Sequence, residues 1–183
     1  PLSVKASADE SVIIAWYIWP SKAVHDAAMQ HAMTDPRLSP EANPMPFDGQ
    51  RVIFGTFDPV LELGAAQPGG YVDGFVVPVK RDRRDEFVAF AEACDPIFME
   101  HGASWIMENW GLDLPDGKIT DFRRAVKAQL DEEVVFSWVQ WPDRAARDAG
   151  NAKIMNDARL AEKEMPFDGK RLIFGGFVPV VEA

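Results

Sequence analysis

Cysteine and basic residues are scarce in this chain. Its 183 residues include one cysteine, Cys94, so the chain can form neither an internal disulfide nor a paired-thiolate metal site. Lys and Arg number 19 against 29 Asp and Glu, which gives a formal net charge of −10 at pH 7. This excess of negative charge repels phosphate backbones, so we do not expect a nucleic acid as a partner. The scarcity of cysteine is typical of a reducing compartment, and we expect a cytoplasmic protein.

Long apolar runs and catalytic signatures are also missing. The longest run, Val12 to Trp19, is far shorter than the ~20 residues of a membrane-spanning helix, and no basic and apolar leader opens the sequence. No membrane partner is therefore expected. Glycine-rich nucleotide loops, the HExxH metal motif and the GxSxG nucleophile turn are absent from the sequence. We expect neither a metal nor a cofactor, and the sequence names no reaction. Apolar residues make up 47% of the chain, which is enough to build a core.

The chain contains an internal repeat. Residues 4–38 and 45–63 align with residues 126–160 and 165–183 at 29 of 54 identical positions. Unrelated sequences would share roughly a tenth of such positions, which indicates a duplication. The first copy carries two extra residues between the two aligned blocks, as expected of a surface loop.

Each copy predicts a strand, a helix and a second strand. The apolar runs Val12 to Trp19 and Val134 to Trp141 are typical of strands that are buried on both faces. Each run ends in Trp-Pro followed by Ser21 or Asp143, residue types that cap helix N-termini. The sequence MPFDG after each helix favours a tight turn, and the RVIFG or RLIFG that follows it predicts the second strand.

The segment between the two copies has no counterpart in the repeat. The predicted elements are a glycine-rich linker, a strand, a long helix and another strand, at residues 64–70, 71–79, 82–101 and 104–110 respectively. Pro96 lies within the helical range, so we expect a kink there or two shorter helices.

This order of elements divides the chain into one complete module and one half-module. Residues 71–183 form β-α-β-β-α-β, the ferredoxin-like or split βαβ arrangement with an antiparallel sheet, and the fold class is α+β. Residues 1–63 correspond only to the second half of such a module. A half-module leaves a strand edge unpaired. We expect either that the chain is part of a tandem protein with a further half-module, or that another chain completes it.

Six ordered motifs resemble a known family. They are YVDGFVVPV at 71–79, HGA at 101–103, ENWGLDLPDGK at 108–118, VVFSWVQWP at 134–142, RDAGN at 147–151 and MPFDGKRLIFGGF at 165–177. Together they resemble the YbaA-like bacterial family, domain of unknown function 1428. The resemblance implies a dimeric or pseudo-dimeric α+β barrel, in which two four-stranded sheets face each other across a cavity. It implies no reaction. The first copy departs from RDAGN, since it has His25, Ala28 and Met29 in place of Arg147, Gly150 and Asn151.

Two acids lie in apolar strands. Glu108 and Asp73 have aromatic or aliphatic neighbours on the same side of their strands, and Phe75 is one of them. Burial raises the pKa of such a carboxyl, so either residue could serve as an acid at neutral pH. The alternative is a structural ion pair with an arginine such as Arg123 or Arg171.

Three further polar residues are site candidates. His101 is the only histidine of the complete module and could transfer a proton, but at a helix end it would also complement the helix dipole. Asn151 could orient a substrate, whereas Gly150 beside it favours close helix packing. Gln140 interrupts an apolar strand and could point into the barrel. Cys94 is predicted to be a buried core thiol.

Aromatic residues could line a ligand cavity. Trp110, Phe136 and Trp138 lie on predicted strands and could enclose a flat apolar ligand, although aromatic side chains on buried strands also simply fill a core.

These residues support three hypotheses. The first is a binding protein that takes a small apolar or aromatic ligand in the barrel cavity, with Glu108, His101 and Asn151 as polar anchors. The second comes from the resemblance, because similar barrels include cofactor-independent monooxygenases; here His101 or Glu108 would transfer a proton on a small aromatic substrate. The third is a structural or partner-binding dimer, in which the chain associates with itself.

Overall fold

An antiparallel sheet forms the middle of the protein. The computed structural model describes residues 1–161 and 163–181. The strand order is β1-β3-β4-β2-β5, and every neighbouring pair is antiparallel. The strands are β1 (Thr56–Gly64), β2 (Tyr71–Lys80), β3 (Trp105–Asp113), β4 (Glu132–Trp141) and β5 (Ile173–Phe177).

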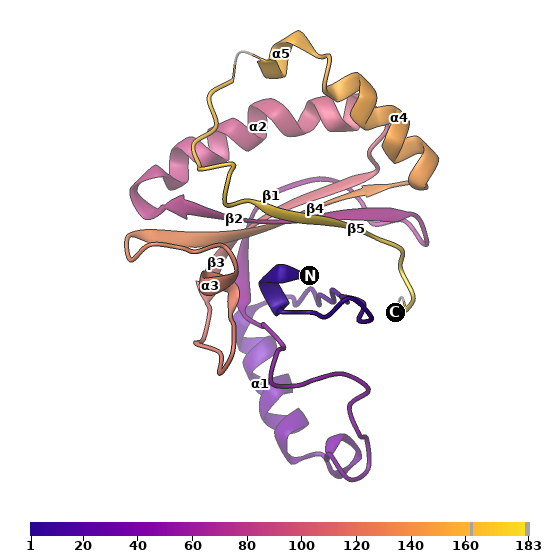
Figure 1. Ribbon diagram of the computed structural model, residues 1–183, viewed down its shortest axis with the longest axis vertical. Helices are drawn as coiled ribbons and strands as arrows, with labels where there is room; N and C mark the ends of the chain where they lie inside the picture. Colours follow the sequence, from indigo (N-terminus) through magenta and orange to yellow (C-terminus); the bar gives the residue numbers. More distant parts are fainter. Residues whose placement is uncertain (162, 182–183) are drawn as a thin grey trace.

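Helices cover one face of this sheet, and the N-terminal part of the chain lies on the other side. Figure 1 shows α2, α4 and α5 above the sheet, and α1 with the N-terminal residues below it. The helices are α1 (Lys22–Thr34), α2 (Arg84–Glu100), α3 (Phe122–Ala125), α4 (Arg144–Ile154) and α5 (Ala158–Ala161), with 3-10 turns η1 (Leu2–Val4), η2 (Pro36–Leu38) and η3 (Arg81–Arg83). The order β2-α2-β3-β4-α4-β5 is the expected ferredoxin-like module, so the α+β prediction is confirmed.

The predicted helix ends are present. The hydroxyl of Ser21 accepts the N–H of Val24 at 3.3 Å, and the carboxylate of Asp143 accepts the N–H of Ala146 at 2.7 Å. Gly102, directly after the end of α2, has a φ of +106°, a conformation that glycine adopts without strain.

The two strands predicted in the first copy are not formed. Residues 12–19 belong to no strand, and Ile13 and Tyr17 are 72% and 79% exposed. The equivalent β4 is a strand because β3 and β2 flank it, whereas no strand of the described residues lies beside residues 12–19 to exchange hydrogen bonds with them. Residues 51–55 are likewise outside any strand, and β1 begins only at Thr56.

Pro96 does not divide the helix in two. It lies inside α2, which continues to Glu100. Proline removes one helical hydrogen bond, but Cys94 and Ile97 on either side of it are buried, and this packing stabilises the helix.

The predicted strand at 104–110 is longer than expected, since β3 reaches Asp113.

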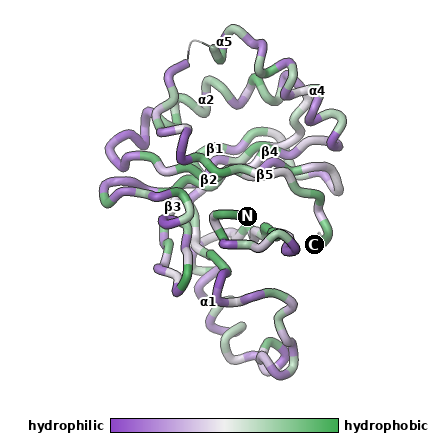
Figure 2. The backbone as a smooth tube through the Cα atoms, viewed as in Figure 1, coloured by the Kyte–Doolittle hydropathy of each residue, from purple (hydrophilic) through white to green (hydrophobic). Residues whose placement is uncertain are grey.

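Apolar side chains fill both faces of the sheet, and Figure 2 shows the apolar stretches along its strands. On the helix face, Val77, Val79 and Val135 pack against Phe87 of α2. On the opposite face, a cluster that includes Trp105, Met107, Phe136 and Trp138 is covered by Ile14 and Trp16 of the first copy. Within the described ranges, none of the helices has the length and apolar character needed to cross a bilayer.

Candidate functional site

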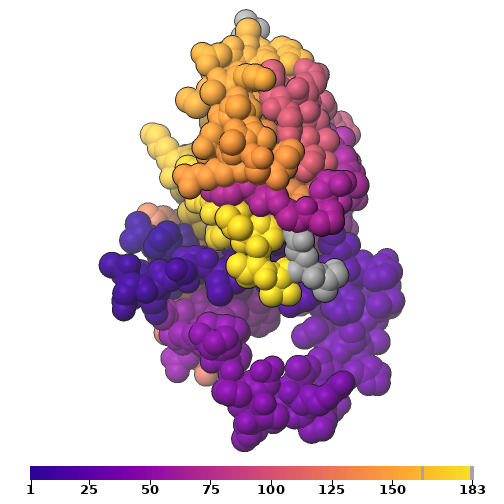
Figure 3. Space-filling model, turned by 90° about the vertical axis from the view of Figure 1, so that its right-hand side faces the viewer, coloured from indigo at the N-terminus to yellow at the C-terminus, as the bar shows by residue number. Residues whose placement is uncertain are grey.

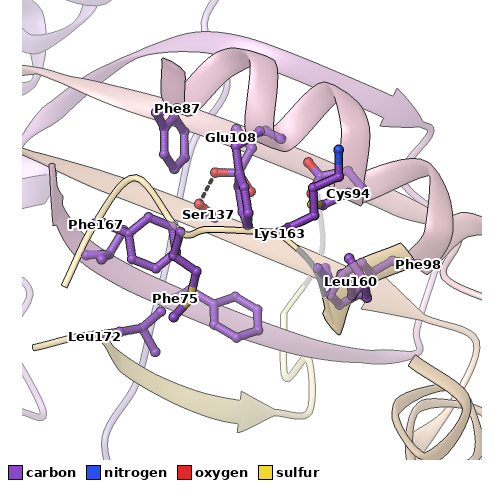
Figure 4. Close-up of a pocket in the computed structure, with 16 residues that line it drawn as sticks. Phe75, Phe87, Cys94, Phe98, Glu108, Ser137, Leu160, Lys163, Phe167 and Leu172 are labelled. Carbon is purple, nitrogen blue, oxygen red and sulfur yellow. Dashed lines mark hydrogen bonds between the residues drawn. The ribbon is translucent and has the colours of Figure 1, made fainter. Parts of the chain in front are cut away.

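A cavity of about 370 Å³ lies between α2, the sheet and the chain that follows α4. Figure 4 shows side chains from these elements pointing toward one another around it. Five aromatic rings make its walls mainly apolar: Phe75, Phe87, Phe90, Phe98 and Phe167. A volume of this size is within the range of small-molecule sites.

Glu108 is the buried acid on the sheet side of this cavity. It lies in β3 and is 9% exposed. Its register partner in β4 is Ser137, whose hydroxyl donates a hydrogen bond to the carboxylate. Burial, the largest cause, and the negative charge of Asp95 together raise the pKa of Glu108 to about 8, although the bond from Ser137 lowers it. Glu108 is therefore largely protonated at neutral pH.

Asp95 faces the same cavity from α2. It is 8% exposed, and burial raises its pKa to about 7. In the part of the chain that the structure describes, its Oδ2 atom has no hydrogen-bond partner. The cavity thus holds two carboxyl groups, one from the helix and one from the sheet, in apolar surroundings.

Cys94 and Lys163 complete the polar and ionisable side chains of the wall. Cys94 is buried, as predicted, and burial together with the charge of Asp95 raises its pKa, while Lys163 lowers it. Lys163 is exposed and forms no salt bridge with any residue that the structure describes. A thiol with a raised pKa is a poor nucleophile, so the cavity is not arranged for cysteine catalysis.

Neither Arg123 nor Arg171, the arginines considered as partners of the strand acids, pairs with Glu108 or Asp73. Arg123 and Arg171 pair with Glu133 and Glu132 instead. Asp73 lies in β2 behind α4, and its carboxylate accepts hydrogen bonds from Nε of Arg147 at 2.8 Å and from Nε1 of Trp141 at 3.2 Å.

Asp73 is therefore held in a buried ion pair, the structural alternative that the sequence left open. Its partner Arg147 is the first residue of the RDAGN motif, so this part of the motif joins α4 to the sheet.

His101, Asn151 and Gln140 lie outside the cavity. Nε2 of His101 is 3.1 Å from Oδ2 of Asp157, which ties the end of α2 to the chain before α5. Asn151 is half-buried on α4. The side-chain amide of Gln140 donates to the carbonyl oxygens of Gln67 and Gly69 at 2.6 and 2.9 Å and so fixes the linker before β2.

The aromatic candidates fall on two different faces of the sheet. Trp110 is on the helix face, with its ring centroid 6.3 Å from that of Phe87. Phe136 and Trp138 are on the opposite face, where Trp138 stacks on Trp16 at 4.9 Å. No shared cavity encloses the three rings in the described structure, and of the candidate residues only Glu108 lines the cavity under α2.

Sequence reasoning missed Asp95 and Ser137 as site residues. Asp95 lies four residues after Ala91 and three before Phe98, so it falls on the apolar stripe of α2, where an acid is unusual. Ser137 is one of two polar interruptions in the apolar run Val134 to Trp141. Both positions carried a signal, because each placed a polar side chain where the pattern calls for an apolar one. Within the described residues, no group of three or more His, Cys, Asp or Glu side chains could hold a metal ion.

The chain matches a family model described as "Protein of unknown function (DUF1428)" over residues 1–49 and 70–169. It is 53% identical over 114 residues to "Uncharacterized protein YbaA" of Escherichia coli strain K12, a match that covers 61% of this chain and 97% of that protein. The protein of the same description from Shigella flexneri matches with the same identity and coverage.

Among solved structures, a monooxygenase-like protein from Listeria innocua has a TM-score of 0.36 at 9% identity, covering 69% of this chain and 65% of that one. At this TM-score the likeness says nothing about the chemistry of the cavity.

Proposed function

The chain belongs to the YbaA-like family of unknown function, DUF1428, and we propose that it binds a small, largely apolar molecule in the cavity under α2. The observation that carries the proposal is the pair of buried carboxyls, Glu108 and Asp95, on the wall of an otherwise apolar cavity. Apolar residues in their places would pack without the cost of burying an ionisable group. Buried acids with raised pKa values are typical of binding and catalytic sites.

Filling the cavity tests this proposal. Ala91 is buried on the cavity side of α2, and Ala91→Phe places a ring in the space that a ligand would occupy. We expect the wild-type chain to bind the neutral probe 2-phenylethanol, measured by saturation-transfer NMR, and Ala91→Phe to lose at least tenfold in affinity. Ala93→Phe, on the exposed side of the same helix, is the matched control and should bind as the wild type does. Equal binding by the two variants, both shown to be folded by circular dichroism, would place the probe elsewhere.

A second candidate function is an enzyme that acts in the same cavity. A carboxyl that stays protonated at neutral pH is suited to general acid catalysis, and Glu108 has this property. In this form the proposal is a cofactor-independent, monooxygenase-like reaction on a small aromatic substrate. Oxygen consumption in the presence of such substrates, lost in Glu108→Gln, would support it.

We further propose that the chain associates with itself through the first copy, which lacks a β-α-β unit like residues 71–113, so that the protein is a self-associating α+β assembly. The local folding of the first copy supports the repeat. Arg51 contacts Glu10, Asp48 and the carbonyl of Lys5, while Arg171 contacts Glu132, Asp168 and the carbonyl of Lys127. Each contact of Arg51 has its counterpart at the equivalent position of the second copy.

The C-terminal segments of the two copies are placed differently, and this difference supports the proposed association. In the first copy, residues 57–63 form most of β1 and pair with β3. In the second copy, β5 ends at Phe177, and Val178, Val180 and Val181 are 67%, 84% and 85% exposed. Figure 3 shows this C-terminal segment in yellow on the surface, above an open gap in the N-terminal part of the chain, which is drawn in indigo and purple. We expect this tail to pair with an edge strand of the neighbouring chain.

A charge on the tail tests the assembly. We expect the 20.4-kDa chain to form a dimer or larger assembly in light scattering, and Val180→Asp to weaken that association at least tenfold, because a charged side chain is costly in an apolar strand pair. Leu130→Asp, at a residue that is 99% exposed outside the tail, is the control. A wild-type chain that stays monomeric at micromolar concentration would contradict the proposal.

We also propose a cytoplasmic location, which the single cysteine supports.

A further inference from the structure

The wall of the cavity under α2 contains a buried carboxyl oxygen that lacks a hydrogen-bond donor among the described residues. Oδ2 of Asp95 is buried and, among the described residues, unpartnered. The described structure gives Glu108 one donor, the hydroxyl of Ser137, although a carboxyl group has two oxygen atoms. A buried acceptor without a donor is costly, and native proteins rarely retain one without a reason such as a ligand.

The charges around the cavity limit which ligand can meet this need. Lys163 is the one cationic side chain among the lining residues, and it is exposed and forms no salt bridge with Asp95 or Glu108. An anionic ligand would bring a third acidic group beside Asp95 and Glu108, and the charge of Asp95 already disfavours the ionised form of Glu108. A purely apolar ligand would leave Oδ2 of Asp95 without a partner.

We propose that the cavity selects a primary ammonium group on a short aromatic or aliphatic body, with the ammonium bound by Asp95 and Glu108 and the body packed against the phenylalanine rings. This inference rests on the proposed binding function and names its ligand class. An ammonium has three N–H donors and no acceptor, so it can donate both to the unpartnered Oδ2 of Asp95 and to the carboxyl of Glu108, whose one donor is Ser137. Its charge also compensates the ionised carboxylates, whose burial is otherwise unfavourable. The aromatic walls add a favourable contact with the cation.

Three probes of similar shape and different charge test the selection. They are 2-phenylethylamine, 2-phenylethanol and 3-phenylpropionate, which are cationic, neutral and anionic at pH 8. Isothermal titration calorimetry of the wild-type chain should show the amine binding at least tenfold more tightly than the alcohol, and no binding of the anion. Because the amine favours the ionised carboxylates, its binding should release protons, which is measured as a difference in heat between buffers of different ionisation enthalpy. The alcohol should release none.

Two isosteric variants connect the selection to its residues. Asp95→Asn and Glu108→Gln keep the shape of each side chain and remove its charge. Each should bring the affinity for the amine to within about threefold of that for the alcohol. Glu92→Gln, on the exposed side of α2, is the control and should leave the preference intact.

The outcomes separate this inference from the proposed function. If the alcohol binds as tightly as the amine, or if both variants keep the preference, the ammonium selection is wrong and the binding function stands. If the anion binds best, Lys163 holds the polar group, and the selection is wrong in sign. If none of the three probes binds, both proposals fail.

Discussion

Replacing Glu108 with glutamine is expected to stabilise the protein at pH 8 and to change its stability little at pH 5. The pKa of Glu108 is about 8 in the folded protein, against an ordinary value of 4.5. Between these two values the carboxyl is protonated in the folded chain and ionised in the unfolded chain, so unfolding releases a proton. The free energy of unfolding therefore falls as the pH rises from 4.5 to 8. The amide of the Glu108→Gln variant has no proton to release, and its oxygen still accepts the hydrogen bond from Ser137.

The size of this effect follows from the same linkage. One proton changes the free energy of unfolding by about 1.4 kcal/mol per pH unit where the two states differ fully in protonation. Hydration of the cavity would narrow the difference between the folded and unfolded pKa values without changing this slope, and we expect the variant to gain about 2 kcal/mol over the wild type between pH 5 and pH 8. Urea unfolding at both pH values measures it, with Glu92→Gln as the control. Parallel pH profiles for Glu108→Gln and the wild type would show that Glu108 is ionised in the folded protein.

Asp95 should leave a residual pH dependence in the Glu108→Gln variant. Its pKa of about 7 also lies above its ordinary value, so its contribution has the same sign and falls in a lower pH range.

The fold of the complete module could be predicted because its signals are local. The apolar runs of β2 and β4, the cap at Asp143 and the apolar stripe of α2 each depend on a few neighbouring residues. The strand predicted at 12–19 fails for the opposite reason. Its sequence has the same apolar character as that of β4, but a strand needs partners, and among the described residues the strands that flank β4 have no equivalent beside the first copy.

The candidate site could be predicted only in part, because strand register is not readable from one sequence. The sequence identifies Glu108 as an acid within an apolar strand, and this places it correctly in a buried position. Its neighbours depend on the pairing of β3 with β4, which sets Glu108 opposite Ser137 and leaves Phe136 and Trp138 on the other face. A shift by one residue would have reversed this arrangement. Asp95 approaches the same point from α2, and only the packing of the helix on the sheet brings the two acids to one cavity.

The largest loss of stability is expected from Arg147→Met. Nε of Arg147 donates to both carboxylate oxygens of Asp73, at 3.1 and 2.8 Å, and Asp73 is 2% exposed. The guanidinium also lies 5.8 Å from the centroid of the Tyr71 ring. Methionine preserves much of the apolar contact but leaves the carboxylate of Asp73 buried with only the Trp141 N–H to compensate it. Removal of one partner from a buried ion pair costs about 3–5 kcal/mol, and we expect about 3 kcal/mol here because Arg147 is partly exposed.

A double-mutant cycle separates the ion pair from simple packing. If the loss comes from the uncompensated carboxylate, adding Asp73→Asn to Arg147→Met should recover about half of it, since the neutral amide is cheaper to bury and still accepts the N–H of Trp141. Arg144→Met, at an arginine of the same helix whose side chain is 76% exposed, should change the free energy of unfolding by less than about 0.5 kcal/mol. Urea unfolding at pH 7 measures five proteins, namely the wild type, Arg147→Met, Asp73→Asn, the double variant and Arg144→Met. A double variant as unstable as Arg147→Met alone would contradict this explanation. The loss would then come from packing around Tyr71 and not from the uncompensated carboxylate of Asp73.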